Sequence, residues 1–450
     1  MIPKYERPDA PVDARYPGTT GNDTGPAAGD IAWRDFFREA RLKKLIELAL
    51  VNNRDLRVAV LNVEQSRAQY RITRAASFPM IQGAGSFTRQ RAPSDVVTSG
   101  DTVTPVGVTY NQWNASLGNT AFELDLFGRV RSLNRQALEK YFATVEAQRS
   151  AQISLVSQVA TEYFTERQAE EQLKVARDTL TAVQGSYDLN KATFNAGASN
   201  ELDMRTAEGE VETARVNELT YEREVAQAKN DLALLVGGPL PAGLPAARPF
   251  NDGDLLARIP AGLPSDLLQR RPDILEAEHT LKAANANIGA ARAAFFPTIT
   301  LTSSIGATSA QLAQLFAKGG GVWSFAPEIT VPIFTGGQNT ADLDSAKVGK
   351  RIEVANYEKA IQTAFREVSD ALVAGSSYAS QVEALVRGIN AEQRRLELAD
   401  VRYRQGEDSY LNVLSAQQDL YTAQQNRIET QYNKLASRIS LYEALGGGWK

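Results

Sequence analysis

The chain has 450 residues, 43% of them hydrophobic, and a formal net charge of −4 at pH 7. This hydrophobic content is enough to bury a core and excludes a disordered chain, while interspersed charges without a Lys or Arg block exclude a nucleic-acid-binding protein. The lack of any cysteine excludes structural disulfides, thiolate metal sites and cysteine nucleophiles.

Residues 1–40 are rich in Pro, Gly and Asp and are predicted to form an extended N-terminal segment, because the first clear helical pattern begins at Arg41. The segment lacks the cationic and apolar regions of a secretory signal, so we expect a chain that is either cytosolic or already processed. No later run approaches the roughly 18 apolar residues of a membrane-spanning helix. Any membrane contact would therefore be made by strands.

From residue 41 onward the chain repeats one pattern, which indicates an internal duplication. RAASFP at 74–79 returns as RAAFFP at 292–297, and FELDLF at 122–127 aligns with ITVPIF at 329–334. Two glycines within helical patterns, Gly197 and Gly406, also correspond. We therefore divide this part into a first repeat at 41–236, a linker or equatorial segment at 237–262, and a second repeat at 263–450. Residues 89–108 have the composition of an exposed loop and account for the greater length of the first copy.

Each copy is predicted to contain two strands, giving four at residues 80–88, 112–126, 298–306 and 322–333. The third, TITLTSSIG, alternates Ile and Leu with Thr and Ser, which is typical of a barrel wall between lipid and water and equally of a half-buried antiparallel sheet. Aromatic residues beside these strands, such as Trp323 and Phe325, favour the membrane interpretation. Because small closed membrane barrels have about eight strands, several copies would have to share one barrel, and three copies would supply about twelve.

A long helical hairpin follows the strands in each copy. In the second copy, apolar residues between Ile361 and Tyr403 recur mostly at alternating spacings of three and four, which predicts a coiled-coil seam. Gly197 and Gly406 fall inside the two hairpins, where glycine can close a helix in the left-handed conformation and turn the chain back. An economical helical turn explains these glycines fully, and a functional tip in both copies is the alternative that their repetition favours.

No group of side chains has the spacing of a catalytic or metal site. His279 is the only histidine, and Glu276 and Glu278 lie two residues apart, on different faces of a helix. The glycine-rich stretch at 236–245 lacks the Lys-Ser/Thr of a phosphate-binding loop. We therefore predict no enzymatic activity, no bound metal and no cofactor.

Several long motifs resemble the outer membrane factor family, and within it the OprM-type channels of tripartite drug efflux pumps more than TolC. They are MIPKYERP at the start, AWRDFF at 32–37, RRPDILEAEHTLKAANANIGAARAAFFP at 270–297, YRQGEDSYLNVLSAQQDLYTAQ at 403–424 and LYEALGGGW at 441–449. The resemblance covers essentially the whole chain. It implies a mainly α-helical homotrimer, in which a twelve-stranded β-barrel in the outer membrane continues as a long coiled-coil helical barrel across the periplasm, with an equatorial belt.

The resemblance also implies a function and partners. The chain would be a passive conduit that opens, exporting drugs or other small molecules, with outer-membrane lipid around it. Its partners would be a periplasmic adaptor and an inner-membrane pump, commonly of the proton-driven RND class. Members of this branch usually begin at a lipid-modified cysteine, so we expect that the numbering starts just after that position or that the cysteine is replaced.

In the family, the hairpin turns form the periplasmic mouth, where adaptor tips dock and the helices coil inward in an iris-like gate. Carried over by motif, Arg402 and Tyr403 would hold the mouth shut and Leu411 would project into the constriction. Ser415 stands where related channels often carry an aspartate, and Asp203 is one candidate to supply negative charge instead. Adaptor contacts would involve Gly197, Ala198, Ser199, Gly406, Glu407 and Asp408, of which Glu407 and Asp408 are also candidates for that charge.

Other interpretations stay open at this stage. Arg402 and Tyr403 could be a surface arginine and a seam tyrosine without a gating role. The channel could serve type I protein secretion or a metal-ion pump, and the heptads would equally fit a soluble coiled-coil structural protein. The sequence does not identify the cargo, because specificity would lie largely with the pump.

Overall fold

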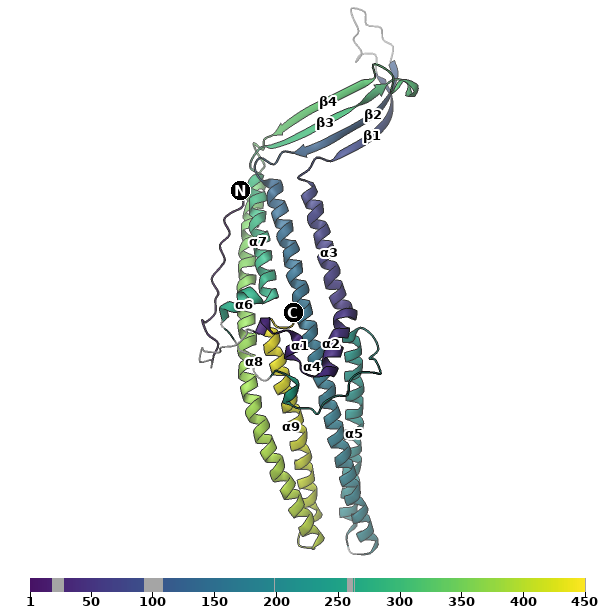
Figure 1. The fold of residues 1–450 in the computed structure, drawn as a ribbon, viewed down its shortest axis with the longest axis vertical. Coiled ribbons are helices and arrows are strands. Elements are labelled where there is room, and N and C mark those ends of the chain that lie inside the picture. The colour runs from purple at the N-terminus through teal and green to yellow at the C-terminus, as the bar shows by residue number, and fades with distance from the viewer. Residues whose placement is uncertain (18–27, 93–107, 198, 257–261, 263, 450) are drawn as a thin grey trace, which may run out of the picture. The chain divides into compact units, whose positions relative to one another are not determined.

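The structure is a computed structural model that describes residues 1–17, 28–92, 108–197, 199–256, 262 and 264–449. The described chain forms two compact units (Figure 1). The sheet unit consists of Met1–Arg7, Glu64–Ala143 and Glu278–Ala355. The hairpin unit consists of Pro8–Val63, Thr144–Ala277 and Asn356–Lys450. Most of the loop predicted at 89–108, and Ala198, lie outside the described residues.

Helices make up most of the described chain, and two of them, α4 and α8, have 67 residues each. The α-helices are α1 (Trp33–Phe36), α2 (Ala40–Asn52), α3 (Arg54–Ala75), α4 (Arg129–Asn195), α5 (Glu201–Val236), α6 (Pro264–Arg270), α7 (Pro272–Ala293), α8 (Gln338–Arg404) and α9 (Tyr410–Ala444). The described ranges also contain the short 3-10 turns η1 (Ala28–Asp30), η2 (Asp252–Asp254) and η3 (Leu312–Gln314). None of the helices, over the residues that the structure describes, combines the length and apolarity needed to cross a membrane.

Within the described residues, four strands form one antiparallel sheet in the order β1-β2-β3-β4. They are β1 (Ile81–Ala92), β2 (Val108–Glu123), β3 (Thr298–Ser309) and β4 (Gly321–Thr330). Strand β2 thus begins and ends earlier than the strand predicted at 112–126. Leu124 still donates its backbone N–H to Ile299 at 2.8 Å, and the next residue, Asp125, belongs to the corner that starts α4.

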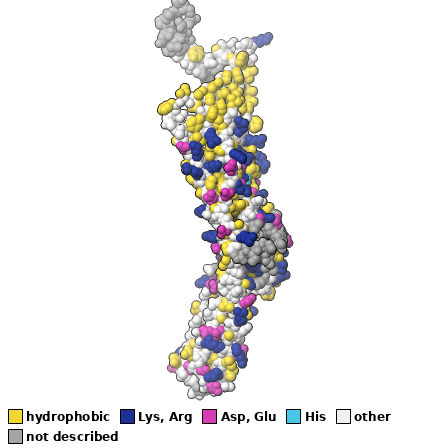
Figure 2. Space-filling view, turned by 90° about the vertical axis from the view of Figure 1, so that its left-hand side faces the viewer, with side chains coloured by type: hydrophobic (Ala, Val, Ile, Leu, Met, Phe, Trp, Pro, Cys, Tyr) yellow, Lys and Arg dark blue, Asp and Glu magenta, His cyan; other side chains and the backbone are white. Residues whose placement is uncertain are grey.

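The register of the sheet separates an apolar face from a polar face. Ile305 lies opposite both Leu117 and Trp323, so side chains of one kind meet across neighbouring strands. The apolar face carries Ile81, Phe87, Trp113, Leu117, Leu301, Ile305, Trp323, Phe325 and Ile329. Hydrophobic side chains gather over the strands in Figure 2. The polar face carries a ladder of hydrogen bonds, including Thr308 to Asn114 at 2.7 Å and Ser304 with Ser324 at 2.9 Å.

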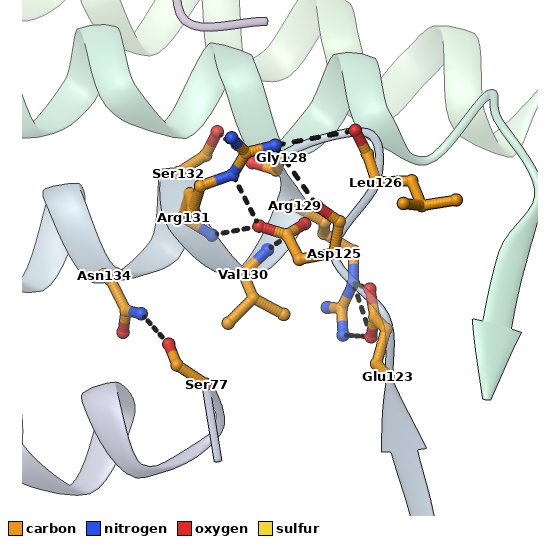
Figure 3. Close-up of polar contacts among 10 residues, drawn as sticks. All are labelled: Ser77, Glu123, Asp125, Leu126, Gly128, Arg129, Val130, Arg131, Ser132 and Asn134. Atoms are coloured by element: carbon orange, nitrogen blue, oxygen red, sulfur yellow. Dashed lines mark hydrogen bonds and ion pairs between the residues drawn. The ribbon is translucent and has the colours of Figure 1, made fainter. Parts of the chain in front are cut away.

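The corner between β2 and α4 is fixed by carboxylates at the start of the helix (Figure 3). Asp125 accepts hydrogen bonds from the backbone N–H groups of Val130 at 3.1 Å and Arg131 at 2.8 Å, which satisfies two donors that a helix start leaves free. Glu123 forms a two-nitrogen ion pair with Arg129. Gly128 between them has φ +78°, a conformation that favours glycine.

The core of the hairpin unit joins two motifs from opposite ends of the sequence. Phe36 of α1 stacks on Tyr442 of α9 with ring centroids 4.0 Å apart, and the Tyr442 hydroxyl donates to the backbone oxygen of Ile31 at 2.6 Å. Gly447 packs against the same tyrosine ring, where any Cβ would lie 2.2 Å from a ring carbon. This packing explains why aromatic residues at 32–37 and a glycine run at 446–448 occur in one chain.

Candidate functional site

The first hairpin turn connects α4 to α5. Gly197 has φ +73° and donates its N–H to the Phe194 carbonyl at 2.9 Å, which closes the last turn of α4. Asn200 then begins α5, since its side chain accepts the N–H of Asp203 at 2.8 Å and donates back to the Asp203 carboxylate at 3.1 Å. Asp203 therefore lies in the first turn of α5, where a negative charge suits the helix dipole.

The second hairpin turn connects α8 to α9 in the same way. Gly406 has φ +76° and bonds to the Tyr403 carbonyl at 2.9 Å, and Glu407 bonds to the Arg402 carbonyl at 3.0 Å. These two bonds form a Schellman motif, in which backbone groups beyond the helix satisfy its last carbonyls. The open space beside Gly197 and Gly406 shows that their conformation, rather than a close approach, is what selects glycine.

An ion pair spans the second turn. Arg402 of α8 donates to the Asp408 carboxylate at 3.2 Å, and Asp408 also accepts hydrogen bonds from the Asn412 side chain and the Ser409 backbone. The hydrogen bond from Asn412, with those from Ser409 and Arg402, lowers the pKa of Asp408 below its ordinary value. The side chain of Arg402 is therefore held against the turn.

A hydrogen bond from Tyr403 links the two hairpins. The Tyr403 hydroxyl donates to the side-chain oxygen of Asn190 of α4 at 2.7 Å, and Asn190 is completely buried. The Tyr403 ring lies 5.5 Å from the Tyr410 ring and packs against a core cluster that contains Val413 and Leu414. Burial, and next the charge of Asp203, raises the pKa of Tyr403 above its ordinary value, so the phenol stays protonated and able to donate.

Two of the expected pore residues lie apart from these contacts. Leu411 is 67% exposed in the first turn of α9. Ser415, one turn further, accepts a hydrogen bond from Arg395 at 3.0 Å, and Arg395 also pairs with Asp419 at 2.6 Å. An acidic group thus lies one turn beyond Ser415.

Three residues of this region were not predicted from the sequence: Asn190, Asp419 and Leu202. Leu202 is 74% exposed in the first turn of α5, and it precedes Leu411 by the same 209 residues that separate the two turn glycines. That offset is a signal that could have identified it. Asn190 offers no such signal, because its partner lies 213 residues away.

Several ionisable groups outside the turns form ordinary structural contacts. His279 lies 2.6 Å from the Glu139 carboxylate in the sheet unit, next to the ion pair of Arg135 with Glu139. Over the described ranges, no three His, Cys, Asp or Glu residues come together in a group that could hold a metal ion.

Comparison with known proteins identifies the family. Residues 45–238 and 263–447 both match the family described as "Outer membrane efflux protein". The toluene efflux pump outer membrane protein TtgC of Pseudomonas putida is 49% identical over all of this chain and 92% of its own length. The cation efflux system protein CusC of Escherichia coli is 42% identical over all of this chain and 96% of its length.

Solved structures agree with this family. A membrane protein from Pseudomonas aeruginosa superposes with a TM-score of 0.93 at 41% identity, covering 99% of this chain and all of that one. The open state of the MtrE outer membrane channel of Neisseria gonorrhoeae superposes with a TM-score of 0.90 at 40% identity, covering all of this chain and 98% of that one.

These matches confirm the predicted duplicated, mainly helical fold with four strands per chain. They also confirm the predicted role as an outer-membrane channel of an efflux pump and, since the family consists of channels, the prediction that the chain is not an enzyme. A soluble coiled-coil structural protein is thereby set aside. The chain belongs to the outer membrane efflux protein family.

Proposed function

We propose that three copies of the chain form the exit duct of a tripartite efflux pump. The observation that carries the proposal is the sheet, which has one apolar face, one polar face, and outer strands β1 and β4 that each pair on one side only among the described residues. Free strand edges are sites where another chain pairs. Three copies would bring about twelve strands, enough to close a membrane barrel that four strands cannot close.

The proposed cargo is small apolar or amphipathic organic molecules. Support comes from relatives that are 47–49% identical and are named as toluene, antibiotic and solvent efflux pump proteins. A metal-ion pump is the second candidate, since CusC is 42% identical. The chain contains one histidine, three methionines and no cysteine, so it offers few of the ligands that soft metal ions prefer.

The proposed partners are a periplasmic adaptor and an inner-membrane transporter of the RND class. In this arrangement the hairpin unit extends into the periplasm, and the adaptor meets the turns at Gly197 and Ser199 and at Gly406, Glu407 and Asp408. The exposure of Gly197, Gly406 and Glu407 supports this assignment, since a docking surface has to be accessible; Ser199 and Asp408 are half-buried beside them. Ala198 would belong to the same surface but lies outside the described residues. A lipid anchor at an N-terminal cysteine stays a prediction.

The contacts of Arg402 and Tyr403 are proposed to hold the mouth closed. Tyr403 joins the α8–α9 hairpin to α4 of the other hairpin, and Arg402 joins the end of α8 to the start of α9. Opening the mouth would separate the hairpins and break the Tyr403 contact. In the closed mouth, Leu411, Ser415 and Asp203 would line the constriction.

The test is the conductance of the purified channel in planar bilayers, after its mass in detergent has shown a trimer. The double variant Arg402→Ala/Tyr403→Ala should raise the conductance or the open fraction, because it removes both contacts. Arg404→Ala is the matched control, since Arg404 is exposed and, among the described residues, forms its one ion pair with Asp400, one turn earlier in the same helix. Equal conductance of the wild type and the double variant would rule out the gating role, and a monomer in detergent would rule out the duct.

A further inference from the structure

Two arginines lie on the apolar face of the sheet, at one end of it. Arg89 and Arg91 follow Phe87 along β1 in steps of two residues, and side chains two apart in a strand project from the same face. Across the ladder, Arg89 lies opposite Asn111 and Arg91 lies opposite Thr109, and all four side chains are exposed. These four residues are called the arginine cluster below.

The arginine cluster lies at the end of the sheet that is remote from the helices (Figure 1). Strand β1 begins after α3 and β2 ends before α4, so Arg91 and Thr109 are near the opposite ends of these strands. The connection from β3 to β4 lies at the same end and contains Lys318. Over the described residues of this end, at 87–92, 108–114 and 305–324, the chain has three cationic side chains and no acidic one.

The register of the strands places the cluster just beyond an apolar band. The band begins near the helices at Ile299 and ends where Ser309 lies opposite Trp113, which in turn lies opposite Phe87. Ile299 and Ser309 are ten residues apart on β3, which is about 33 Å along the strand. With the roughly 40° tilt of strands in outer-membrane barrels, this gives a height of about 25 Å, the height of the lipid-facing band in such barrels. The two arginines lie about 5 and 10 Å beyond it.

This height is the level of the phosphate groups of a membrane. The headgroup region extends about 5 to 8 Å beyond the hydrocarbon core on each side. The rings of Phe87 and Trp113 lie against each other at the edge of the band, with centroids 4.4 Å apart, and aromatic pairs at this level are typical of membrane interfaces. An arginine there can rest its stem on apolar surface while its guanidinium binds a phosphate through two N–H donors.

The chain itself supplies no anion to the arginine cluster. Within the part of the chain that the structure describes, Arg89 and Arg91 form no ion pair and no side-chain hydrogen bond. The acidic residues of the described strands, Glu123 and Glu328, lie near the other end of the sheet, and Glu123 already pairs with Arg129. Two arginines about 7 Å apart on one strand repel each other, and a phosphate between them would replace this repulsion with attraction.

We propose that the arginine cluster binds the phosphate groups of lipid A, the bisphosphorylated glycolipid of the outer leaflet of the outer membrane. In the proposed duct the helices extend into the periplasm, so the opposite end of the sheet faces the outer leaflet. The acyl chains of the lipid would lie on Phe87 and Trp113, and its phosphates would accept hydrogen bonds from the arginines and from Asn111. This inference rests on the proposed duct.

Native mass spectrometry of the purified trimer in mild detergent tests the assignment. The probes are bisphosphorylated lipid A and the same lipid with its phosphates removed, and the trimer should bind the first about tenfold more tightly. Arg89→Gln/Arg91→Gln should lose most of this preference. The same spectrum gives the mass of the assembly, so lipid binding is compared between intact trimers. Equal affinity of the wild-type and variant trimers for lipid A would overturn the assignment.

Two further variants separate local recognition from net charge. Arg223→Gln/Arg387→Gln is the matched control, since it removes two charges from exposed positions of the hairpin unit, and it should bind lipid A as the wild type does. A loss equal to that of the cluster variant would overturn recognition by the cluster. Arg89→Lys/Arg91→Lys keeps both charges and should retain most of the affinity. A loss as large as that of the glutamine variant would overturn charge as the basis of binding.

Phosphatidylglycerol and inorganic phosphate distinguish lipid A from other sources of phosphate. Phosphatidylglycerol carries a single phosphate diester and should bind more weakly, and inorganic phosphate should not displace lipid A. Equal affinity for phosphatidylglycerol and lipid A would overturn the assignment to the outer leaflet. A trimer without any preference for phosphorylated lipid would overturn this inference and leave the duct intact, whereas a monomer in detergent would overturn the proposed duct.

Discussion

Replacing Tyr403 with phenylalanine removes one hydroxyl and leaves the ring in its cluster beside Tyr410. The lost hydrogen bond is the one to Asn190, which is completely buried, so the amide oxygen would lose its partner without gaining water. Leaving a buried polar group without a partner costs about 1 to 2 kcal/mol. In our proposal only the closed mouth contains this contact, so the opening equilibrium of each copy should shift by roughly 5- to 30-fold towards the open form.

The assay is single-channel recording of the Tyr403→Phe variant in planar bilayers. Its open fraction should rise, and the Arg404→Ala control should match the wild type. The thermal midpoint of the trimer distinguishes the alternatives, because a contact present in every state would lower stability without changing the open fraction. An unchanged open fraction together with a lower midpoint would refute the reasoning.

Two further predictions concern stability. Gly406→Ala should destabilise the hairpin by about 1 to 2 kcal/mol, because alanine is strained at φ +76°. Gly388 lies inside α8 with open space around it, so Gly388→Ala should stabilise the protein by about 0.5 to 1 kcal/mol. Thermal unfolding of the trimer measures both effects. Burial, with the nearby charge of Glu39, raises the pKa of Asp254 to about 6, so this group favours folding at low pH and the benefit is lost as pH rises from about 4 to 6. Asp254→Asn should therefore raise the thermal midpoint at pH 7.5 and match the wild type at pH 4; a lower midpoint at pH 7.5 would contradict the assigned cause.

The fold follows from local patterns to a large extent. Alternation of Ile and Leu with Thr and Ser is visible within nine residues at 298–306, and it corresponds to the apolar and polar faces of β3. The two glycines 209 residues apart each have positive φ at the end of a 67-residue helix. Periodicity and glycine conformation are properties of short segments, so a single sequence exposes them.

The residues at which helices begin and end depend on contacts with distant residues, which local sequence patterns do not show. Helices α2 and α3 are separate because Asn53 caps α3, accepting the Leu56 N–H at 2.9 Å while donating to the Leu235 carbonyl at 2.9 Å. The N-terminal segment, expected to be extended up to residue 40, contains α1 because Phe36 and Phe37 reach the aromatic ring of Tyr442. Both features need residues almost two hundred or more positions away.

The candidate site shows the same division. The pair of Arg402 with Asp408 spans six residues across one turn and was open to inference from the sequence. The hydrogen bond of Tyr403 to Asn190 could not be inferred from the sequence. An asparagine within a helical seam usually indicates a structural register rather than a specific partner.

The chemistry of the two contacts proposed to hold the mouth closed bears on what would open it. Asn190 carries an amide that does not titrate, and the raised pKa of Tyr403 keeps its phenol neutral at physiological pH. The lowered pKa of Asp408 keeps its carboxylate charged, and its pair with Arg402 is lost only as pH falls through that lowered value. The chain's single histidine, His279, belongs to the sheet unit and takes part in neither contact.

Neither contact therefore changes its protonation between pH 5.5 and 8, and protons alone should not open the mouth. In our proposal, contact with the adaptor at the hairpin turns would separate the hairpins. We expect the open fraction of the isolated channel in planar bilayers to stay constant over this pH range, with the Tyr403→Phe variant higher by the same factor at each pH. An open fraction that rises steeply between pH 7 and 5.5 would show that a titrating group holds the mouth, and would displace Tyr403 and Arg402 from that role.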